Sequence, residues 1–255
     1  MNVKIKNKFE LNKIRKSGAV LHEVFKAIIP KVKAGISTRE LDVLAEKQIR
    51  KRGAYPAFKG VRGIVPYPAT LCIAVNEEVV HGIPNSRTLN DGDIIGIDCG
   101  AILQDYYSDS AVTLPVGETS PEAAKLMEIT KLALHEGIKQ CYPGNYLGDV
   151  SHAIQVTIEG AGYSVVKDLY GHGIGKNLHE DPPVHNYGIP GEGIELAARM
   201  VLAIEVMSCQ FGDQTITKDD GWTVVTADGG LSAHFEDTII VTRDGPENVT
   251  GQNPF

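Results

Sequence analysis

Apolar residues recur at three- and four-residue spacing near the start of the chain. Over residues 10–32 this spacing predicts a long amphipathic helix with one buried stripe, made up of Leu11, Ile14, Leu21, Val24, Phe25, Ile28, Ile29 and Val32. A second helix is predicted from Ser37, where a Ser-Thr-Arg-Glu run has capping-box spacing, to Gly53, because glycine is typical of a helix end.

The same arrangement returns about 109 residues later. Ser120, Pro121 and Glu122 predict the start of a helix that runs to about Gln140. Five residues that follow it (Gly144, Val150, Ile154, Ile158 and Gly162) align at that offset with Gly35, Leu41, Ala45, Ile49 and Gly53. The match indicates two related halves. Two unrelated amphipathic helices that end in glycine would also align, and the sequence leaves both interpretations open.

Segments rich in β-formers follow the second helix of each half, with turn residues between them. The predicted strands cover residues 71–75, 94–99, 106–114, 201–208, 222–227 and 234–242. Helices and strands thus alternate in two blocks, and no linker rich in Pro, Gly or Ser separates the blocks. We therefore expect the α+β class and a single domain over residues 1–255.

Composition and charge narrow the class of protein. The 255 residues are 42% hydrophobic and 22% charged, as in ordinary globular proteins. No apolar run approaches the roughly 20 residues that cross a bilayer, and the start lacks a secretion signal, so we expect a cytoplasmic protein without a membrane partner. Cys72, Cys99, Cys141 and Cys209 form no Cys-x-x-Cys pair, so we expect buried, reduced thiols.

The net charge of −7 argues against a protein that is wholly nucleic-acid binding. Residues 1–33 nevertheless hold nine Lys and Arg against two Asp and Glu. This basic segment is either a solvated helix face or a surface that docks near ribosomal RNA through phosphate attraction. The sequence does not decide between the two.

Carboxylates at the ends of apolar strands are the first candidates for chemistry. Asp98 and Glu205 each end such a strand, and small residues, Gly96 and Ala203, precede them by two positions on the same strand face. A lone buried charge is costly unless something compensates it. The small neighbours leave room for ions beside the carboxylates.

Asp98 and Asp109 flank a turn expected near Leu103 and Gln104, so we predict that they face each other directly across a hairpin. Two such charges need a cation or a proton between them. Glu236 is a third carboxylate, at the head of an apolar run. Any one of these carboxylates is compatible with an exposed strand end or with one side of a salt bridge. Three carboxylates in apolar strands together favour a metal cluster.

Histidines supply the second kind of ligand. His81, His172 and His179 lie beside glycines, which permit tight turns next to a site. His22, His135 and His152 fall in helical stretches and are interpreted as surface or packing residues, while His185 and His234 receive no role. Mixed imidazole and carboxylate ligands suit Zn, Mn, Fe or Co, and a pair of such ions supports hydrolysis. The chain has no nucleophile elbow, phosphate loop or dinucleotide fingerprint.

These motifs together resemble one family over nearly the whole chain. Segments 76–84, 92–98, 109–110, 171–175, 179–180, 203–205, 222–223 and 232–236 are similar in kind and order to those of type I methionine aminopeptidases. The resemblance implies the pita-bread fold, with two pseudo-symmetric halves around a curved antiparallel sheet. It also implies hydrolytic removal of the first methionine from nascent polypeptides, with a small second residue favoured, by a protein expected to be monomeric.

The resemblance further assigns roles to individual residues. Two divalent metal ions would be bound by Asp98, Asp109, His172, Glu205 and Glu236, with Asp109 and Glu236 bridging both ions. Glu205 would also transfer the proton from the attacking water to the leaving amine. His81 and His179 would contact the substrate and stabilise the tetrahedral intermediate. The walls of the methionine pocket would include Tyr67, Cys72 and Trp222.

Four residues depart from the family pattern without removing an expected ligand. Leu178 stands where Phe is usual, Val206 where Pro is usual, and His234 and Asp237 where Gln and His are common. These departures bear on the shape of the pocket and on the rate. Two rival interpretations are a proline-directed peptidase of the same fold, which would carry a larger N-terminal domain, and a non-enzymatic binding module, which would have lost the ligands.

Overall fold

The computed structural model describes residues 2–251, so both ends of the expected 1–255 domain lie outside the described residues. The helices are α1 (Lys8–Ile28), the short 3-10 helix η1 (Ile29–Lys31), α2 (Thr38–Lys51), α3 (Pro121–Ile138) and α4 (Leu147–Gly160). Ser37 and Ser120 cap α2 and α3 as predicted. The α-helical part of the first predicted helix ends at Ile28, because Pro30 has no backbone N–H to continue the pattern.

The strands form one large antiparallel sheet and one small sheet. Their bounds are β1 (Tyr55–Pro56), β2 (Leu71–Val75), β3 (Glu78–Val80), β4 (Ile94–Leu103), β5 (Tyr106–Pro115), β6 (Ser164–Val165), β7 (Tyr170–Gly173), β8 (Glu180–His185), β9 (Val201–Cys209), β10 (Thr215–Thr217), β11 (Val224–Thr226), β12 (Ser232–Thr242) and β13 (Gly245–Asn248). The large sheet has the order β1-β4-β5-β12-β9-β7-β8, with β2 beside β4, β6 beside β9 and β13 beside β12. The small sheet has the order β10-β11-β3.

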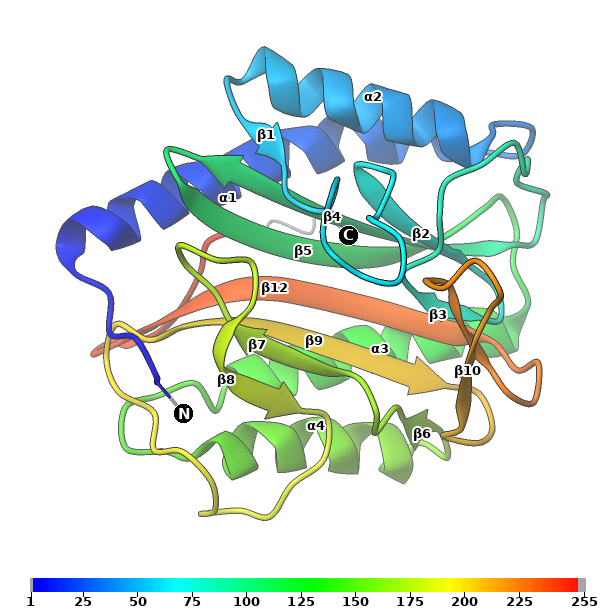
Figure 1. The fold of residues 1–255 in the computed structure, drawn as a ribbon. Coiled ribbons are helices and arrows are strands. Elements are labelled where there is room, and N and C mark those ends of the chain that lie inside the picture. Colours follow the sequence, from blue (N-terminus) through cyan, green and yellow to red (C-terminus); the bar gives the residue numbers. More distant parts are fainter. Residues whose placement is uncertain (1, 252–255) are drawn as a thin grey trace.

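The two halves repeat each other closely. The helices α2 and α4 both contain 14 residues and start 109 positions apart. The glycines before them, Gly35 and Gly144, have φ angles of 87° and 93°, a left-handed conformation that L side chains disfavour. Figure 1 shows α1 and α2 on one side of the sheet's midline and α3 and α4 on the other. This arrangement supports the interpretation that the halves are related.

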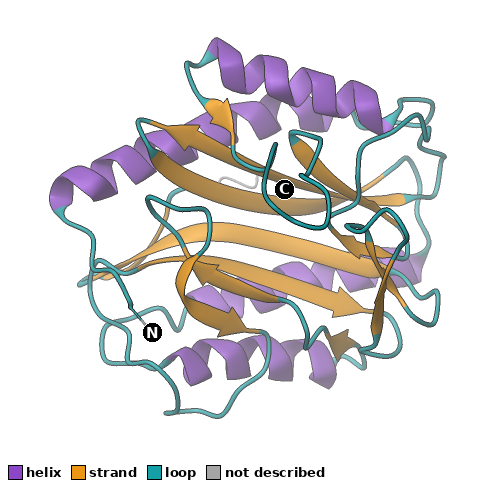
Figure 2. Ribbon diagram, in the orientation of Figure 1, coloured by secondary structure: helices purple, strands orange, loops and turns teal. Residues whose placement is uncertain are grey.

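The helices cover one face of the large sheet (Figure 2). Apolar side chains on that face, among them Ile97 of β4, Ile204 of β9 and Phe235 of β12, share one buried cluster with residues of all four α-helices. Alternate residues of the same strands point to the opposite face. Because the helix-side residues must be buried, the register of the strands is fixed. The residues that alternate with them along each strand therefore point to the open face.

Two further expectations concern cysteines and membrane spans. All four cysteines are buried free thiols, as predicted. Within residues 2–251 no helix combines the length and apolar character that crossing a membrane requires.

Candidate metal centre

Five adjacent strands each contribute one acidic or imidazole side chain to the open face of the large sheet. In sheet order these are Asp98 of β4, Asp109 of β5, Glu236 of β12, Glu205 of β9 and His172 of β7. The register aligns them, because Asp98 and Glu236 are both paired with Ala111, and Glu236 is paired with Glu205. Directly paired residues point to the same face. The sheet therefore gathers all five predicted side chains in one place.

The predicted direct pairing of Asp98 with Asp109 is wrong. The turn lies at Gln104 and Asp105, which have φ angles of 53° and 65°, one position later than expected. Asp98 is consequently opposite Ala111, and Asp109 is opposite Gly100. The two carboxylates are diagonal neighbours on the same face, still within interaction range. The small side chain of Ala111 leaves the floor of the site open between Asp98 and Glu236.

The carboxylates carry the electrostatic signature of a crowded, desolvated site. Burial raises the pKa of Asp98, Asp109 and Glu236 well above the ordinary range, and the nearby charge of Glu205 raises all three further. Burial is the largest influence on Glu205 and acts to raise its pKa, but the hydrogen bond from His172 and the charges of His172, His234 and His81 together lower it. The Nε2 atom of His172 lies 3.1 Å from Glu205 Oε1. Without cations, this group of charges is unfavourable.

Several buried polar atoms in this site lack hydrogen-bond partners among the described residues. These atoms are Asp98 Oδ1, Glu236 Oε1 and His234 Nε2. An unpaired buried polar atom costs about 1–3 kcal/mol, and such atoms are rare unless a ligand or ion meets them. Candidate ligand atoms of Asp109, His172 and Glu236 also lie within 4.8 Å of one another. The oxygen-rich set with imidazole fits divalent transition metals.

His234 is a site residue that the sequence interpretation missed. Its Nε2 lies 4.0 Å from both Glu205 Oε2 and Glu236 Oε2, and its side chain is buried. Burial lowers its pKa to about 4. The signal was present in the sequence, because His234 precedes Glu236 by two positions on one strand and must share its face.

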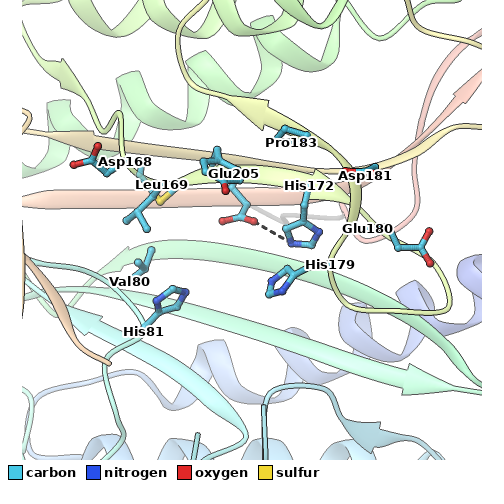
Figure 3. Close-up of a pocket in the computed structure, with 12 residues that line it drawn as sticks. Val80, His81, Asp168, Leu169, His172, His179, Glu180, Asp181, Pro183 and Glu205 are labelled. Atoms are coloured by element: carbon cyan, nitrogen blue, oxygen red, sulfur yellow. Dashed lines mark ion pairs between the residues drawn. The ribbon is translucent and has the colours of Figure 1, made fainter. Parts of the chain in front are cut away.

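Two more predicted histidines border this centre from an outer cleft of about 750 Å³ (Figure 3). The ring of His179 lies edge-on to that of His172, with centroids 4.4 Å apart. His81 has a left-handed backbone with φ of 59°, an uncommon conformation for a non-glycine residue. Figure 3 shows the rings of His81 and His179 facing the side chains of Glu205 and His172.

A smaller inner pocket of about 210 Å³ ends on the carboxylates. Its remaining walls include Phe58, Val61, Arg62, Tyr67, Cys72, Leu178 and Trp222. The predicted wall residues are therefore brought together, whereas Phe58, Val61 and Arg62 were missed because they lie in an irregular loop. The hydroxyl of Tyr67 lies 2.8 Å from the carbonyl of Leu71 and 2.9 Å from that of Gly82, so its one proton is shared between these two acceptors and its ring lines the pocket.

Comparisons with known proteins agree with this geometry. A family model described as metallopeptidase family M24 matches residues 12–243. The chain belongs to this family. It is 50% identical over 246 residues to a methionine aminopeptidase of Clostridium perfringens, covering 96% of this chain and 98% of that protein. It is 46% identical to methionine aminopeptidase 1 of Bacillus subtilis, covering 94% and 96% of the two chains.

Solved structures similar to this chain confirm the expected fold. A methionine aminopeptidase from Thermotoga maritima superposes with a TM-score of 0.95 at 41% identity, covering 98% of this chain and 100% of that one. A prolidase from Pyrococcus horikoshii has a TM-score of 0.77 at 24% identity and shares the fold, with this chain spanning 63% of its length. The predicted pita-bread architecture and resemblance to methionine aminopeptidases are thus confirmed, and the chain is a metal-dependent hydrolase of family M24.

Proposed function

We propose that this M24 hydrolase removes the N-terminal methionine from nascent proteins and peptides. The observation that carries the proposal is the inner pocket, which has an apolar wall of Phe58, Val61, Tyr67, Cys72, Leu178 and Trp222 and ends on the carboxylates of the metal centre. Such a pocket accepts one apolar side chain and places the adjoining peptide bond beside the catalytic groups. The names of the relatives from Clostridium perfringens and Bacillus subtilis support methionine as that residue.

The metal part of the proposal is two divalent ions, with Co, Mn, Fe or Zn as candidates. Asp98, Asp109, His172, Glu205 and Glu236 would hold them, and Asp109 and Glu236, in the middle of the row, would bridge both. Two observations support this assignment. Oxygen atoms of Asp98 and Glu236 lack hydrogen-bond partners among the described residues, and the pKa values of Asp109 and Glu236 are raised. When bound, such a pair of ions activates water as a nucleophile and polarises the attacked carbonyl.

The remaining groups bind the substrate and move protons. Glu205 has the lowered pKa of a carboxylate that is ionised at neutral pH, so it can accept the proton of the attacking water and pass it to the leaving amine. His81 and His179 flank the point where the inner pocket meets the outer cleft, and we propose that they donate hydrogen bonds to the carbonyl oxygen as negative charge develops. Tyr67, Cys72 and Trp222, with Leu178, would enclose the methionine side chain.

The same junction supports selectivity for a small second residue. The inner pocket and the outer cleft have His81, His172, His179 and Glu205 in common. The second residue of a bound peptide would therefore emerge between imidazole rings, which leave little room for a large side chain. We further propose that residues 1–255 form one catalytic domain, which acts as a monomer in the cytoplasm and meets nascent chains at the ribosome.

A peptide panel tests this proposal. Metal-loaded protein is incubated with Met-Gly-X, Met-Lys-X and X-Pro peptides, and released amino acids are quantified. We expect methionine release from Met-Gly-X only. Glu205→Gln should lower that release by about 100-fold or more, because general acid–base groups contribute about 10²–10⁴-fold. Cleavage of X-Pro bonds instead, or full activity of Glu205→Gln, would overturn the assignment.

A further inference from the structure

One imidazole in the metal centre has no role in the five-residue set. His234 lies on β12 two positions before Glu236 and is paired with Met207 of β9. Its backbone is fixed from the neighbouring strand, because the backbone N–H of His234 donates to Thr113 Oγ1 at 2.8 Å and its carbonyl accepts from the same hydroxyl at 2.9 Å. The side chain is 4% exposed. Its position is therefore set by the sheet.

The distances around His234 Nε2 suit a shared cation and do not suit a hydrogen bond. Nε2 lies 4.0 Å from Glu205 Oε2 and 4.0 Å from Glu236 Oε2, beyond the range of a hydrogen bond. Metal ions of the zinc type bind nitrogen and oxygen at about 2.0–2.2 Å, so two ligands of one ion lie about 3–4.3 Å apart, depending on the angle. Candidate ligand atoms of Glu205, His234 and Glu236 also all lie within 4.8 Å of one another.

A packed imidazole without a ligand is the main alternative. A buried imidazole nitrogen normally has a partner, and Nε2 of His234 has none among residues 2–251. In addition, the nearest ionic groups are two carboxylates that already belong to the metal centre. The nitrogen points at two carboxylates but is too far from either for a hydrogen bond. An ion between the three groups would pair with all of them.

We propose that His234 Nε2 is a sixth protein ligand of the metal centre, which binds an ion together with Glu205 and Glu236. The inference rests on the proposed two-metal function. His234 and His172 then bring two imidazoles to a site that is otherwise all carboxylate. Since imidazole favours Zn, Co, Ni or Fe and oxygen ligands favour Mn or Mg, His234 shifts the preference of the centre toward the former ions.

The direct test counts coordinated imidazoles. Protein with ¹⁵N-labelled histidine is loaded with Co(II), and exchangeable imidazole N–H signals with large paramagnetic shifts are counted by NMR. The wild type should give two such signals, from His172 and His234, and His234→Gln should give one. A wild type that binds Co(II) with a single shifted imidazole signal would overturn the inference.

Metal titration provides the second readout. Zn(II), Co(II) and Mn(II) are titrated into metal-free wild type, His234→Gln and His234→Asn, with folding checked by circular dichroism. We expect His234→Gln to weaken Zn(II) and Co(II) binding at one site by about 100-fold, and Mn(II) binding by less. A residue that only supports a ligand can also change affinity by about 10–100-fold, but its loss removes no imidazole from the metal. It would therefore weaken Zn(II) and Mn(II) binding alike. An unchanged ratio of Zn(II) to Mn(II) affinity would count against His234 as a ligand.

A matched control and the wild type separate the possible failures. His152→Gln makes the same chemical change on α4, away from the metal centre, and should leave the signals and affinities unchanged. If the wild type binds two ions and releases methionine but shows one coordinated imidazole, only the role of His234 is wrong. If the wild type binds no ions, the proposed function fails as well.

Discussion

Gly171 lies where β7 approaches β9 too closely for any side chain. A Cβ atom added there would lie 2.3 Å from the carbonyl oxygen of Ala203 and 3.0 Å from the backbone nitrogen of Glu205. Ordinary van der Waals contact begins at 3.4 Å, so Gly171→Ala forces the backbones apart by about 1.1 Å. The next residue of β7 is His172, which is paired with Ala203. The substitution therefore perturbs the contact between His172 and Glu205.

The size of this clash sets the expected losses of stability and of activity. Overpacking of this kind costs about 1–3 kcal/mol. For a chain of about 250 residues, each kcal/mol lowers the melting temperature by about 2–4 °C, so we expect a decrease of about 2–12 °C. A displacement of about 1 Å at a catalytic group costs about 100-fold in rate. We therefore expect kcat/KM for a Met-Gly-X peptide to fall by about 100-fold.

The assay compares Gly171→Ala with Gly160→Ala. Gly160 is the last residue of α4, and a Cβ added there meets nothing within 4 Å. The control should keep full activity and remain within about 1 kcal/mol of the wild type, since alanine favours a helix over glycine by about that amount. Urea unfolding gives the stability, and initial rates on the peptide give the activity. Wild-type stability and activity in Gly171→Ala would refute the reasoning.

Two further predictions concern charges. Raised pKa values of Asp98, Asp109 and Glu236 mean that the metal-free fold holds protons that the unfolded chain releases above about pH 4. The stability of EDTA-treated protein, measured as the midpoint of urea unfolding, should thus fall as pH rises from about 4 towards neutral. Excess Co(II) should abolish this fall. A midpoint that rises with pH in the metal-free protein would contradict the prediction. Lys6→Met should cost about 2–3 kcal/mol and lower kcat, because Lys6 Nζ lies 2.6 Å from Glu180 Oε2 with both side chains buried beside His179. Lys4→Met removes an exposed partner of Glu180 at 3.5 Å and should cost less than 1 kcal/mol; equal losses in the two variants would count against a structural role for the buried pair.

Local patterns in the sequence predicted the helices and the caps of α2 and α3. Ser37 and Ser120 act within one helical turn, so their effect can be read directly from the neighbouring residues. The strands β7 and β8 were missed because Gly171 and Pro183 break the usual strand composition. These strands form because β7 pairs with β9 and β8 pairs with β7, contacts that no local pattern records.

The sequence predicted which side chains would lie together, and predicted less of their geometry. Asp98 and Asp109 were expected on one face, but their register depended on a turn that is one residue later than assumed. His234 was left without a role although it precedes Glu236 by two positions, because only the fold shows that Glu205 also lies beside it. Pairing of β9 with β12 brings these groups together, and pairing between distant segments is the part that sequence patterns do not specify.

In the proposed centre, five side chains from five adjacent strands bind two metal ions. The most direct measurement is the amount of metal bound by purified protein after removal of metal and reconstitution with Co(II) or Mn(II). We predict two equivalents per chain for the wild type, and about one for Asp98→Asn, because Asp98 lies at the end of the row and is not a bridging residue in the proposal. An uptake of one equivalent or less by the wild type at saturating metal would contradict the two-metal site.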